Sequence, residues 1–218
     1  MAFKNIKNRR LRAWLTVIGI LIGITAVVSL IGLGEGLREA ITGQFGFLGN
    51  DIISVSASGS GQGPPGTGVV DPLTRDSLGR IDSLKEVEGA AGRVIQAGKA
   101  EYNDEVGFGF AVSMPDGDAR DLIEDSIGLE TVKGRLLQDG ETGKIVLGNQ
   151  LADKASFDKE VRVGDEMKIE GKDFEIIGIL EKKGSFTVDS MVFMNEDDVR
   201  DLFDIDKDVY DVFAVRFN

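Results

Sequence analysis

The side chains with the clearest chemical potential are three alternating aspartates near the end of the chain, Asp204, Asp206 and Asp208. Alternating carboxylates open the calcium-binding loop of EF-hand proteins, where they supply oxygen ligands. That loop also requires glycine at its sixth position and a bidentate glutamate at its twelfth. Val209 and Val215 occupy those two positions here, so the spacing does not predict a calcium site.

Two other acidic groups have local structural interpretations. Residues 195–198, Asn-Glu-Asp-Asp, stand where a helix is expected to begin, and such side chains cap free amides and complement the helix dipole. Asp116 and Asp118 flank Gly117 in a composition that is typical of turns. We therefore expect these carboxylates to shape the backbone and not to perform catalysis.

The chain contains no histidine and no cysteine, which removes the commonest general base, the commonest zinc ligands and every disulfide. Gly61, Gly63 and Gly66 satisfy a dinucleotide-binding spacing, but the two prolines between them lack the amide hydrogens that a pyrophosphate needs. Gly143 and Lys144 are followed by isoleucine, where a phosphate-binding loop requires Ser or Thr. The sequence therefore predicts no catalytic, cofactor-binding or metal-binding residue, no cofactor and no enzyme activity.

Charge and hydropathy divide the chain into a membrane anchor and a larger acidic region. Residues 13–33 contain no charge, and roughly 20 apolar residues at about 1.5 Å each match the hydrocarbon thickness of a bilayer. Residues 1–12 carry five of the 25 Lys and Arg, and all 37 acidic residues follow. The positive-inside rule then predicts a cell-membrane protein with a cytoplasmic N-terminus and an extracytoplasmic remainder. The net charge of −12 argues against nucleic acid as a partner.

A cleaved signal peptide is the main alternative to this anchor. Its apolar region should span about 7 to 15 residues and end at a small-x-small cleavage site. The apolar run here is longer, and no clear Ala-x-Ala follows it. A lipoprotein is excluded because the chain has no cysteine to acylate.

The anchor and its continuation carry several glycines. Gly19 and Gly23 have the Gly-x-x-x-Gly spacing that allows close helix approach, although glycine is also frequent in membrane helices generally. Beyond residue 33, apolar residues at helical spacing predict a helical stalk over 34–48, which the glycines at 32, 34 and 36 would weaken.

The first extracytoplasmic elements have the pattern of a β-α-β unit. Residues 51–56 are β-branched and predict a strand, and the Gly, Ser and Pro run at 58–68 predicts a loop. Thr74 should cap a helix that ends before Gly89, with Leu73 and Leu78 as a hydrophobic staple and Leu78, Ile81 and Leu84 as its buried stripe. A returning strand over 93–102 would imply parallel pairing with the first.

The next region has short alternating strands separated by Gly and Asp, which predict an inserted β-rich subdomain, a partly closed barrel. Expected strands cover 106–113, 144–147, 167–169, 174–180 and 190–193, and expected helices lie near 118–125, 149–155 and 195–203. A last strand is expected over 209–218. The predicted fold class is α+β: one transmembrane helix and stalk, then a mixed α/β domain with a β-α-β sheet subdomain interrupted by a smaller β-rich one. The expected boundaries are 1–12 (cytoplasmic), 13–33 (membrane), 34–48 (stalk), 49–102 (first half of the core), 103–205 (insertion) and 206–218 (returning half).

The order of these pieces resembles the MacB-like family, the permease subunits of macrolide-exporter and lipoprotein-release ABC transporters. The basic start and glycine-containing membrane helix are similar, as is Leu48-Gly-Asn-Asp-Ile-Ile-Ser-Val55 at the entry to the core. Further similar passages are Gly134-Arg135, Lys144-Ile-Val-Leu-Gly148, Val163-Gly-Asp165, Phe174-Glu-Ile-Ile-Gly-Ile-Leu180 and Met191-Val-Phe-Met194. Members normally have four membrane helices, three of them after the core, whereas this sequence has one apolar stretch of that length; we expect a fragment or a truncated gene product.

The resemblance implies a function and partners. It implies a permease that works with a cytoplasmic ATP-binding subunit and a second permease protomer, a homodimer, to move an apolar or amphipathic cargo. Closure of the ATPase would be transmitted through the first helix to the extracytoplasmic domain. The alternative is a membrane-anchored binding or scaffold protein that regulates a cell-envelope process without transport. An extracytoplasmic enzyme is a third alternative, but no nucleophile with a positioned base supports it.

Overall fold

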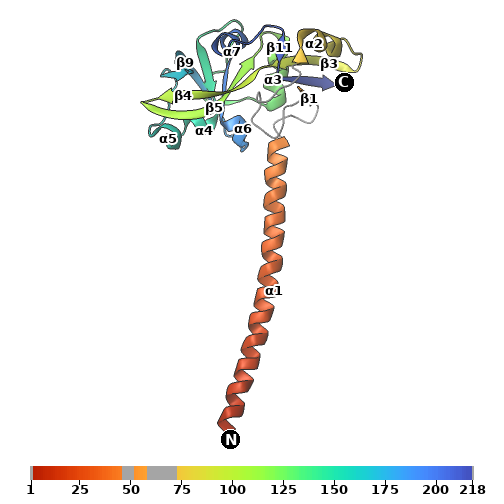
Figure 1. Cartoon of the computed structure of the whole chain (residues 1–218), viewed down its shortest axis with the longest axis vertical. Coiled ribbons are helices and arrows are strands. Elements are labelled where there is room, and N and C mark those ends of the chain that lie inside the picture. The colour runs from red at the N-terminus through yellow and green to blue at the C-terminus, as the bar shows by residue number, and fades with distance from the viewer. Residues whose placement is uncertain (1, 46–51, 58–72, 218) are drawn as a thin grey trace. The chain divides into compact units, whose positions relative to one another are not determined.

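The computed structural model describes residues 2–45, 52–57 and 73–217, and within the first helix it describes side chains only over residues 14–36. It divides into two compact units, residues 1–43 and 44–218. The first unit is the main part of α1 (Ala2–Phe45), a continuous helix of 44 residues (Figure 1). The second is a mixed α/β domain, as the sequence predicted.

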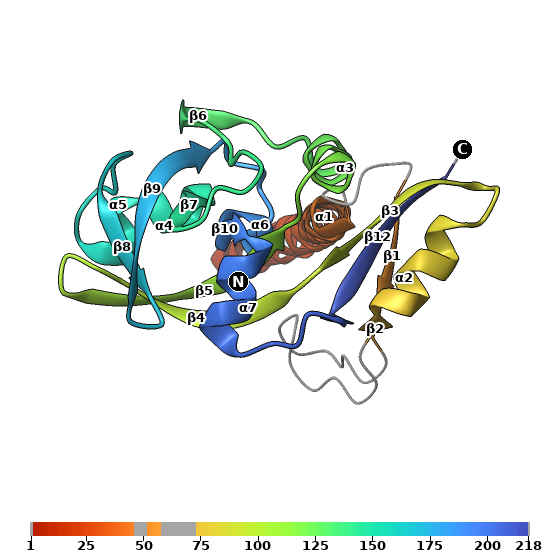
Figure 2. The ribbon, with the colours of Figure 1, turned by 90° about the horizontal axis from the view of Figure 1, so that it is seen from above.

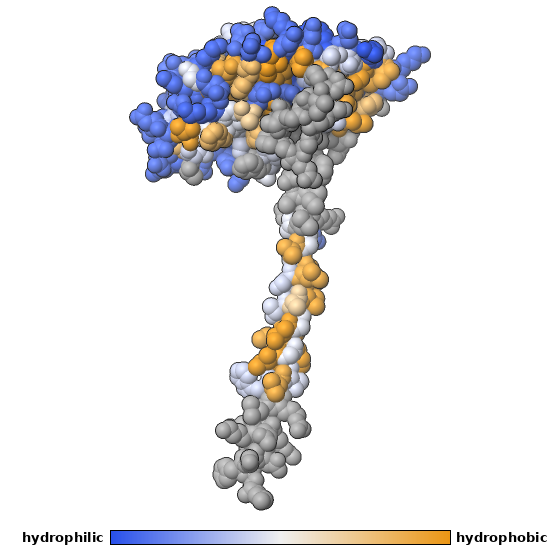
Figure 3. All heavy atoms as spheres, viewed as in Figure 1, coloured by the Kyte–Doolittle hydropathy of each residue, from blue (hydrophilic) through white to orange (hydrophobic). Residues whose placement is uncertain are grey.

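Helix α1 contains one segment suited to a bilayer. Residues Trp14–Gly36, 23 in number, have a mean hydropathy of 2.5, and none of these residues is buried. Figure 3 shows apolar and small side chains along this part of the helix. The helix continues unbroken past Gly32, Gly34 and Gly36 to Phe45, so the expected stalk region is helical over 34–45.

A small three-stranded sheet begins the domain, and its order corrects the predicted parallel pairing. Strands β1 (Ile52–Ser56) and β3 (Val87–Arg93) run in the same direction, but β12 (Val212–Phe217) lies between them and is antiparallel to both. The strand expected over 93–102 corresponds to β4 (Ile95–Tyr102), which belongs to a different sheet, so its predicted parallel pairing with the first strand was wrong. Strands β2 (Leu73–Thr74) and β11 (Val209–Tyr210) form a separate two-stranded antiparallel pair. In the sequence, β2 follows β1 and β11 directly precedes β12.

Helix α2 (Arg75–Asp82) joins β1 to β3 and packs on β3 (Figure 2). The Thr74 side chain accepts a hydrogen bond from the Ser77 amide at 3.3 Å, which confirms the predicted cap. Leu78 and Ile81 pack against the core, but the helix ends at Asp82, earlier than expected. Leu84 therefore lies outside the helix and is exposed, so its place in the predicted buried stripe was wrong.

The remaining strands form a second sheet that closes on itself. They are β4 (Ile95–Tyr102), β5 (Glu105–Met114), β6 (Thr131–Gly134), β7 (Lys144–Leu147), β8 (Glu166–Ile169), β9 (Lys172–Leu180) and β10 (Met191–Asn195). Their order is β6-β9-β7-β10-β5-β4-β8, and β8 also pairs with β9. Six strands thus form a closed ring, with β6 attached to β9, and we call this the ring sheet (Figure 2).

Short helices fill the connections of the ring sheet. They are α3 (Asp118–Ile127), α4 (Asn149–Ala152), α5 (Lys154–Phe157), α6 (Phe186–Asp189) and α7 (Glu196–Phe203). The helix expected over 149–155 is two helices, because Asp153 is extended between them. The Asn195 side chain accepts from the Asp197 amide at 2.9 Å, which confirms the helix start predicted there.

Two apolar cores hold these layers together. One includes inward residues of the ring such as Ile145, Met167 and Met194, and extends to Phe213 of the small sheet and to α2. The other includes Phe193 and Val146 from the opposite face of the ring and the α3 residue Ile123. Both cores span the two sheets, so the domain is one compact body.

Candidate functional site

The acidic residues singled out in the sequence take part in local contacts. Asp204 ends α7 in a left-handed conformation, with φ of 53°. The Asp206 carboxylate accepts from the Asp208 amide at 3.0 Å, and the Asp208 carboxylate lies 3.3 Å from the Arg75 guanidinium. Over residues 14–36, 52–57 and 73–217, no group of three or more potential ligand side chains could hold a metal ion.

The acidic turn around Gly117 connects three segments. Asp118 opens α3, and the Asp116 carboxylate lies 2.8 Å from the Arg120 guanidinium. The same Asp116 oxygen accepts from the Gly140 amide and from the Asn195 side chain, both at 3.2 Å. This carboxylate therefore fixes two loops and a strand end, a role that its turn-like sequence context did not reveal.

Of the two sequence patterns that resemble nucleotide-binding motifs, the structure describes only the one at Gly143-Lys144. Gly61, Gly63 and Gly66 lie outside the described residues. Gly143 precedes β7 with φ of 70°, and its amide donates to the Asp198 carboxylate at 2.8 Å. The Lys144 ammonium donates to Glu141 at 2.8 Å, so both residues of the Gly-Lys pair have contacts within the domain.

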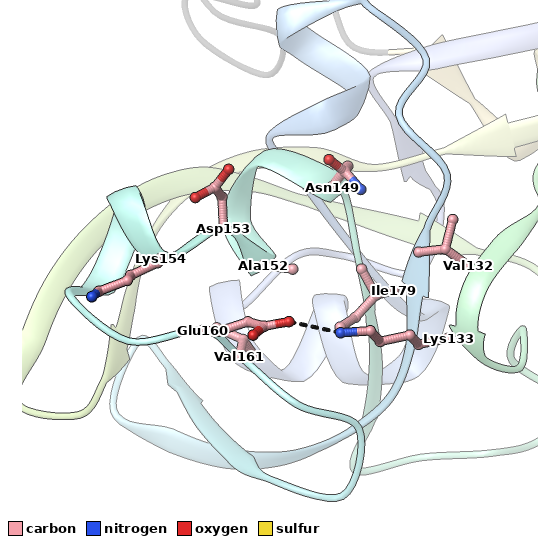
Figure 4. Close-up of a pocket in the computed structure, with 9 residues that line it drawn as sticks. All are labelled: Val132, Lys133, Asn149, Ala152, Asp153, Lys154, Glu160, Val161 and Ile179. Carbon is pink, nitrogen blue, oxygen red and sulfur yellow. Dashed lines mark hydrogen bonds and ion pairs between the residues drawn. The ribbon is translucent and has the colours of Figure 1, made fainter.

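A solvent-open hollow of about 420 Å³ lies beside β6. The nearly buried residues Ala152, Val161 and Ile179 form an apolar floor. Lys133 and Glu160 point toward one another at its edge, with Nζ and Oε1 2.7 Å apart, while Asp153 lies at the end of α4 (Figure 4). Apolar and paired charged groups suit contact with an amphipathic molecule, and the lining offers no nucleophile with an adjacent base.

A second feature is the place where the chain passes from the small sheet into the ring sheet, between Arg93 and Ile95. Asp211, 8% exposed, accepts through Oδ2 from the Ile95 amide at 2.8 Å and from the Gln96 side chain at 3.3 Å. Its own amide donates to the Arg93 carbonyl at 3.0 Å. Burial raises the pKa of Asp211 above its ordinary value, and the bond from the Ile95 amide opposes this shift.

The backbone of Val94 completes this connection. Its amide donates to the Ser113 hydroxyl at 2.7 Å, and its carbonyl accepts from the Ser113 amide at 2.9 Å. We call the set Arg93, Val94, Ile95, Ser113 and Asp211 the sheet junction. Its backbone is buried and held by these hydrogen bonds, and neither Asp211 nor Ser113 was singled out by the sequence.

Comparisons with known proteins identify the family. Residues 13–218 match the family model of the MacB-like periplasmic core domain. The chain is 33% identical over 203 residues to an uncharacterized ABC transporter permease of Methanocaldococcus jannaschii, covering 93% of the chain and 49% of that protein. It is 28% identical over 194 residues to the macrolide export ATP-binding/permease protein MacB of Hyphomonas neptunium, covering 85% of the chain and 28% of that protein.

Solved structures show the same fold. The periplasmic region of MacB from Actinobacillus actinomycetemcomitans gives a TM-score of 0.57 at 14% identity, covering 83% of this chain and 80% of that one. The extracellular domain of the noncanonic ABC-type transporter YknZ from Gram-positive bacteria gives 0.56 at 16% identity, covering 77% and 82%.

The chain spans about half or less of the length of these curated relatives, 49% and 28%. Its apolar helix and mixed α/β domain agree with a membrane protein that carries an extracytoplasmic domain. The chain belongs to the MacB-like periplasmic core domain family of ABC transporter permeases.

Proposed function

We propose that this chain is the N-terminal portion of a permease subunit, with residues 1–12 in the cytoplasm, 13–33 in the bilayer and the domain outside. The observation that carries the proposal is the family match from residue 13 to residue 218, which includes both the apolar helix and the domain. The five basic residues before the helix favour this orientation. Residues 34–48 then form the stalk, 49–93 and 206–218 the sheet-and-helix part, and 95–205 the inserted part. The inserted part begins before the expected boundary at residue 103, because β4 belongs to the ring sheet.

A separate cytoplasmic subunit would hydrolyse ATP. The sequence lacks a phosphate-binding loop at Gly143, and the M. jannaschii relative carries a permease name without an ATP-binding part. The Hyphomonas relative carries both names, but the chain matches only 28% of it. ATPase closure would move α1, and α1 continues in the chain toward the domain, so movement is transmitted mechanically to the outer face.

The proposed assembly is a homodimer of permease protomers that moves an apolar or amphipathic cargo. A relative named for macrolide export supports a cargo of this kind. The apolar floor and charged edge of the hollow beside β6 are compatible with such a molecule.

Cross-linking of the stalk tests the proposal. Glu39→Cys and Thr42→Cys variants of the complete permease, assembled with its ATP-binding partner, should cross-link between protomers to different extents with and without ATP. The chain has no native cysteine, so each variant reports one site. Cross-linking that is equal in both states would contradict the proposal and favour an anchored binding or scaffold protein.

A further inference from the structure

In chain order, β1 is the first strand of the domain after α1. Phe45 ends the helix and Ile52 begins β1, and the two are joined by the chain itself. Among the described strands, β1 pairs with β12 and with no other, in register from Ile52 opposite Arg216 to Ser56 opposite Val212. A displacement of β1 is therefore passed to β12 by a ladder of backbone hydrogen bonds.

Asp211 lies at the point where this displacement would reach the ring sheet. It directly precedes β12, and its carbonyl accepts from the Ala57 amide, just after β1, at 3.1 Å. Its carboxylate binds the Ile95 amide, the first residue of β4, at 2.8 Å. One residue thus bonds to the end of β1, to β3 through the Arg93 carbonyl, and to β4 of the ring sheet.

The chemistry of these bonds makes the connection stiff. A hydrogen bond from a buried backbone amide to a carboxylate is shorter and stronger than a hydrogen bond between two neutral groups, and its direction is fixed. Asparagine at 211 weakens these bonds, because its neutral carbonyl oxygen is a weaker acceptor than a carboxylate and its NH2 group cannot accept from the Ile95 amide or the Gln96 side chain. At Val94, the Ser113 hydroxyl accepts from the backbone amide and the Ser113 amide donates to the backbone carbonyl.

We propose that Asp211 is a positioning residue that fixes the angle between the small sheet and the ring sheet, so that movement entering at β1 reaches the ring. Without its carboxylate the angle between the two sheets should vary more, and movement of the small sheet should reach the ring less completely. The inference rests on the proposed transport function, because that function supplies the movement.

Asp189 provides a matched control. It is 5% exposed, close to the value of Asp211, and its carboxylate also accepts from backbone amides, those of Lys183 at 2.9 Å and Gly184 at 3.0 Å. These contacts lie within a connection of the ring sheet. Asp189→Asn removes the same charge from a comparable site without touching the sheet junction.

The first measurement uses this chain alone, in detergent micelles. Spin labels at Leu84→Cys, after α2, and Phe108→Cys, on β5, report the distance between the two sheets, and both native side chains are exposed. Asp211→Asn should broaden the distance distribution, and Asp189→Asn should leave its width unchanged. Gln96→Met removes only the 3.3 Å side-chain bond to Asp211 and should broaden the distribution less, which keeps the test available if Asp211→Asn folds poorly. An unchanged width in both junction variants overturns the proposal.

The second measurement uses the complete permease with its ATP-binding partner, comparing ATP-bound and nucleotide-free states. In the parent protein and in Asp189→Asn, label pairs at Leu84 and at Phe108 in the two protomers should both change distance. In Asp211→Asn the change at Leu84 should persist and the change at Phe108 should be reduced. A full change at Phe108 in Asp211→Asn overturns the inference about Asp211, whereas no change at either site in the parent protein contradicts the transport function itself.

Discussion

Replacement of Arg93 by methionine should stabilise the domain. Arg93 ends β3 and is 5% exposed. Within the described part of the chain, neither Nε nor Nη2 has a hydrogen-bond partner, and the guanidinium carbon lies 5.9 Å from the centre of the Phe193 ring. A buried charge without a counter-ion is unfavourable, and an apolar residue of similar volume removes that penalty.

The magnitude follows from the pKa of Arg93. Burial lowers this pKa from 12.5 to about 10. At about 1.4 kcal/mol per pKa unit, the folded state disfavours the charged form by about 3 kcal/mol. This penalty is present at every pH below about 10, where Arg93 is charged in both the folded and unfolded states. Loss of the contact with the Phe193 ring offsets about 1 kcal/mol.

Arg93→Met should therefore raise the free energy of unfolding by about 2 kcal/mol, or Tm by roughly 4 to 8 °C for a domain of this size. Urea denaturation followed by circular dichroism, and calorimetry, both in detergent micelles, measure the two quantities.

Arg200→Met is the matched control because Arg200 is equally buried, at 4%, but well paired. Its Nε donates to the Glu196 carboxylate at 2.9 Å, and its Nη1 donates to the carbonyls of Asp206 and Val209. Its guanidinium carbon also lies 4.8 Å from the centre of the Tyr210 ring. Removing one side of such a buried network should cost about 3 to 5 kcal/mol. If Arg93→Met destabilises the domain as Arg200→Met does, the reasoning about Arg93 is refuted.

Three further predictions concern stability. Gly178→Ala should cost several kcal/mol of stability and increase amide exchange in β6, because its Cβ would lie 2.2 Å from the Arg135 carbonyl oxygen. Gly79→Ala, in open space on α2, should instead stabilise the domain by about 1 kcal/mol. Equal effects of the two variants in thermal denaturation would contradict this prediction. The pKa of Glu141 is held far below its ordinary value, first by hydrogen bonds from the Arg135 guanidinium, so its ionised form stabilises the fold above the ordinary glutamate pKa of 4.5, and this contribution is lost as pH falls further. Glu141→Gln should lower stability at pH 7 and reduce the acid dependence measured by urea midpoints from pH 7 to pH 3; an unchanged profile would count against the pairing. Asn195→Ala should cost about 1 kcal/mol in urea denaturation by removing the α7 cap, and no measurable loss would show that the cap is not needed.

Elements with a strong local signal were predicted correctly. The β-branched run Lys144–Leu147 is β7, with the expected bounds, and the Asn195 cap begins α7 as expected. The apolar helix needs only its own composition to be recognised. Each of these elements is determined by residues within the element itself, so its local sequence is enough to predict it.

The missed features depend on contacts between distant parts of the chain. Strand β3, Val-Glu-Gly-Ala-Ala-Gly-Arg, has little β propensity, and the sequence predicted a helix that ends before Gly89 and a strand that begins only at Arg93. Its small residues fit their neighbours: a Cβ at Gly92 would lie 2.5 Å from the Tyr210 ring. The insertion of β12 between β1 and β3 brings together residues more than 100 positions apart, which no local pattern indicates.

The sheet junction was also beyond local prediction. Arg93 and Asp211 are single charged residues among small or apolar neighbours, and such residues in strands usually face solvent, yet both are buried. Their burial results from the meeting of two sheets. The sequence showed glycines in the passages that resemble the MacB-like family, but it did not show why glycine is needed there. The structure gives the reason at Gly148, where a Cβ would lie 2.5 Å from the Asp189 carbonyl oxygen. Such close backbone approach requires glycine and is known only from the fold.

The sidedness of the membrane is the most direct test of the central claim, that one helix crosses the bilayer and carries the domain to the outer face. Single-cysteine variants Asn8→Cys, before the helix, and Leu84→Cys, in the domain, are expressed in cells whose outer surface is accessible to a membrane-impermeant maleimide. The reagent should label Leu84→Cys in intact cells and Asn8→Cys only after lysis. Labelling of Asn8→Cys in intact cells, with Leu84→Cys protected until lysis, would contradict the account.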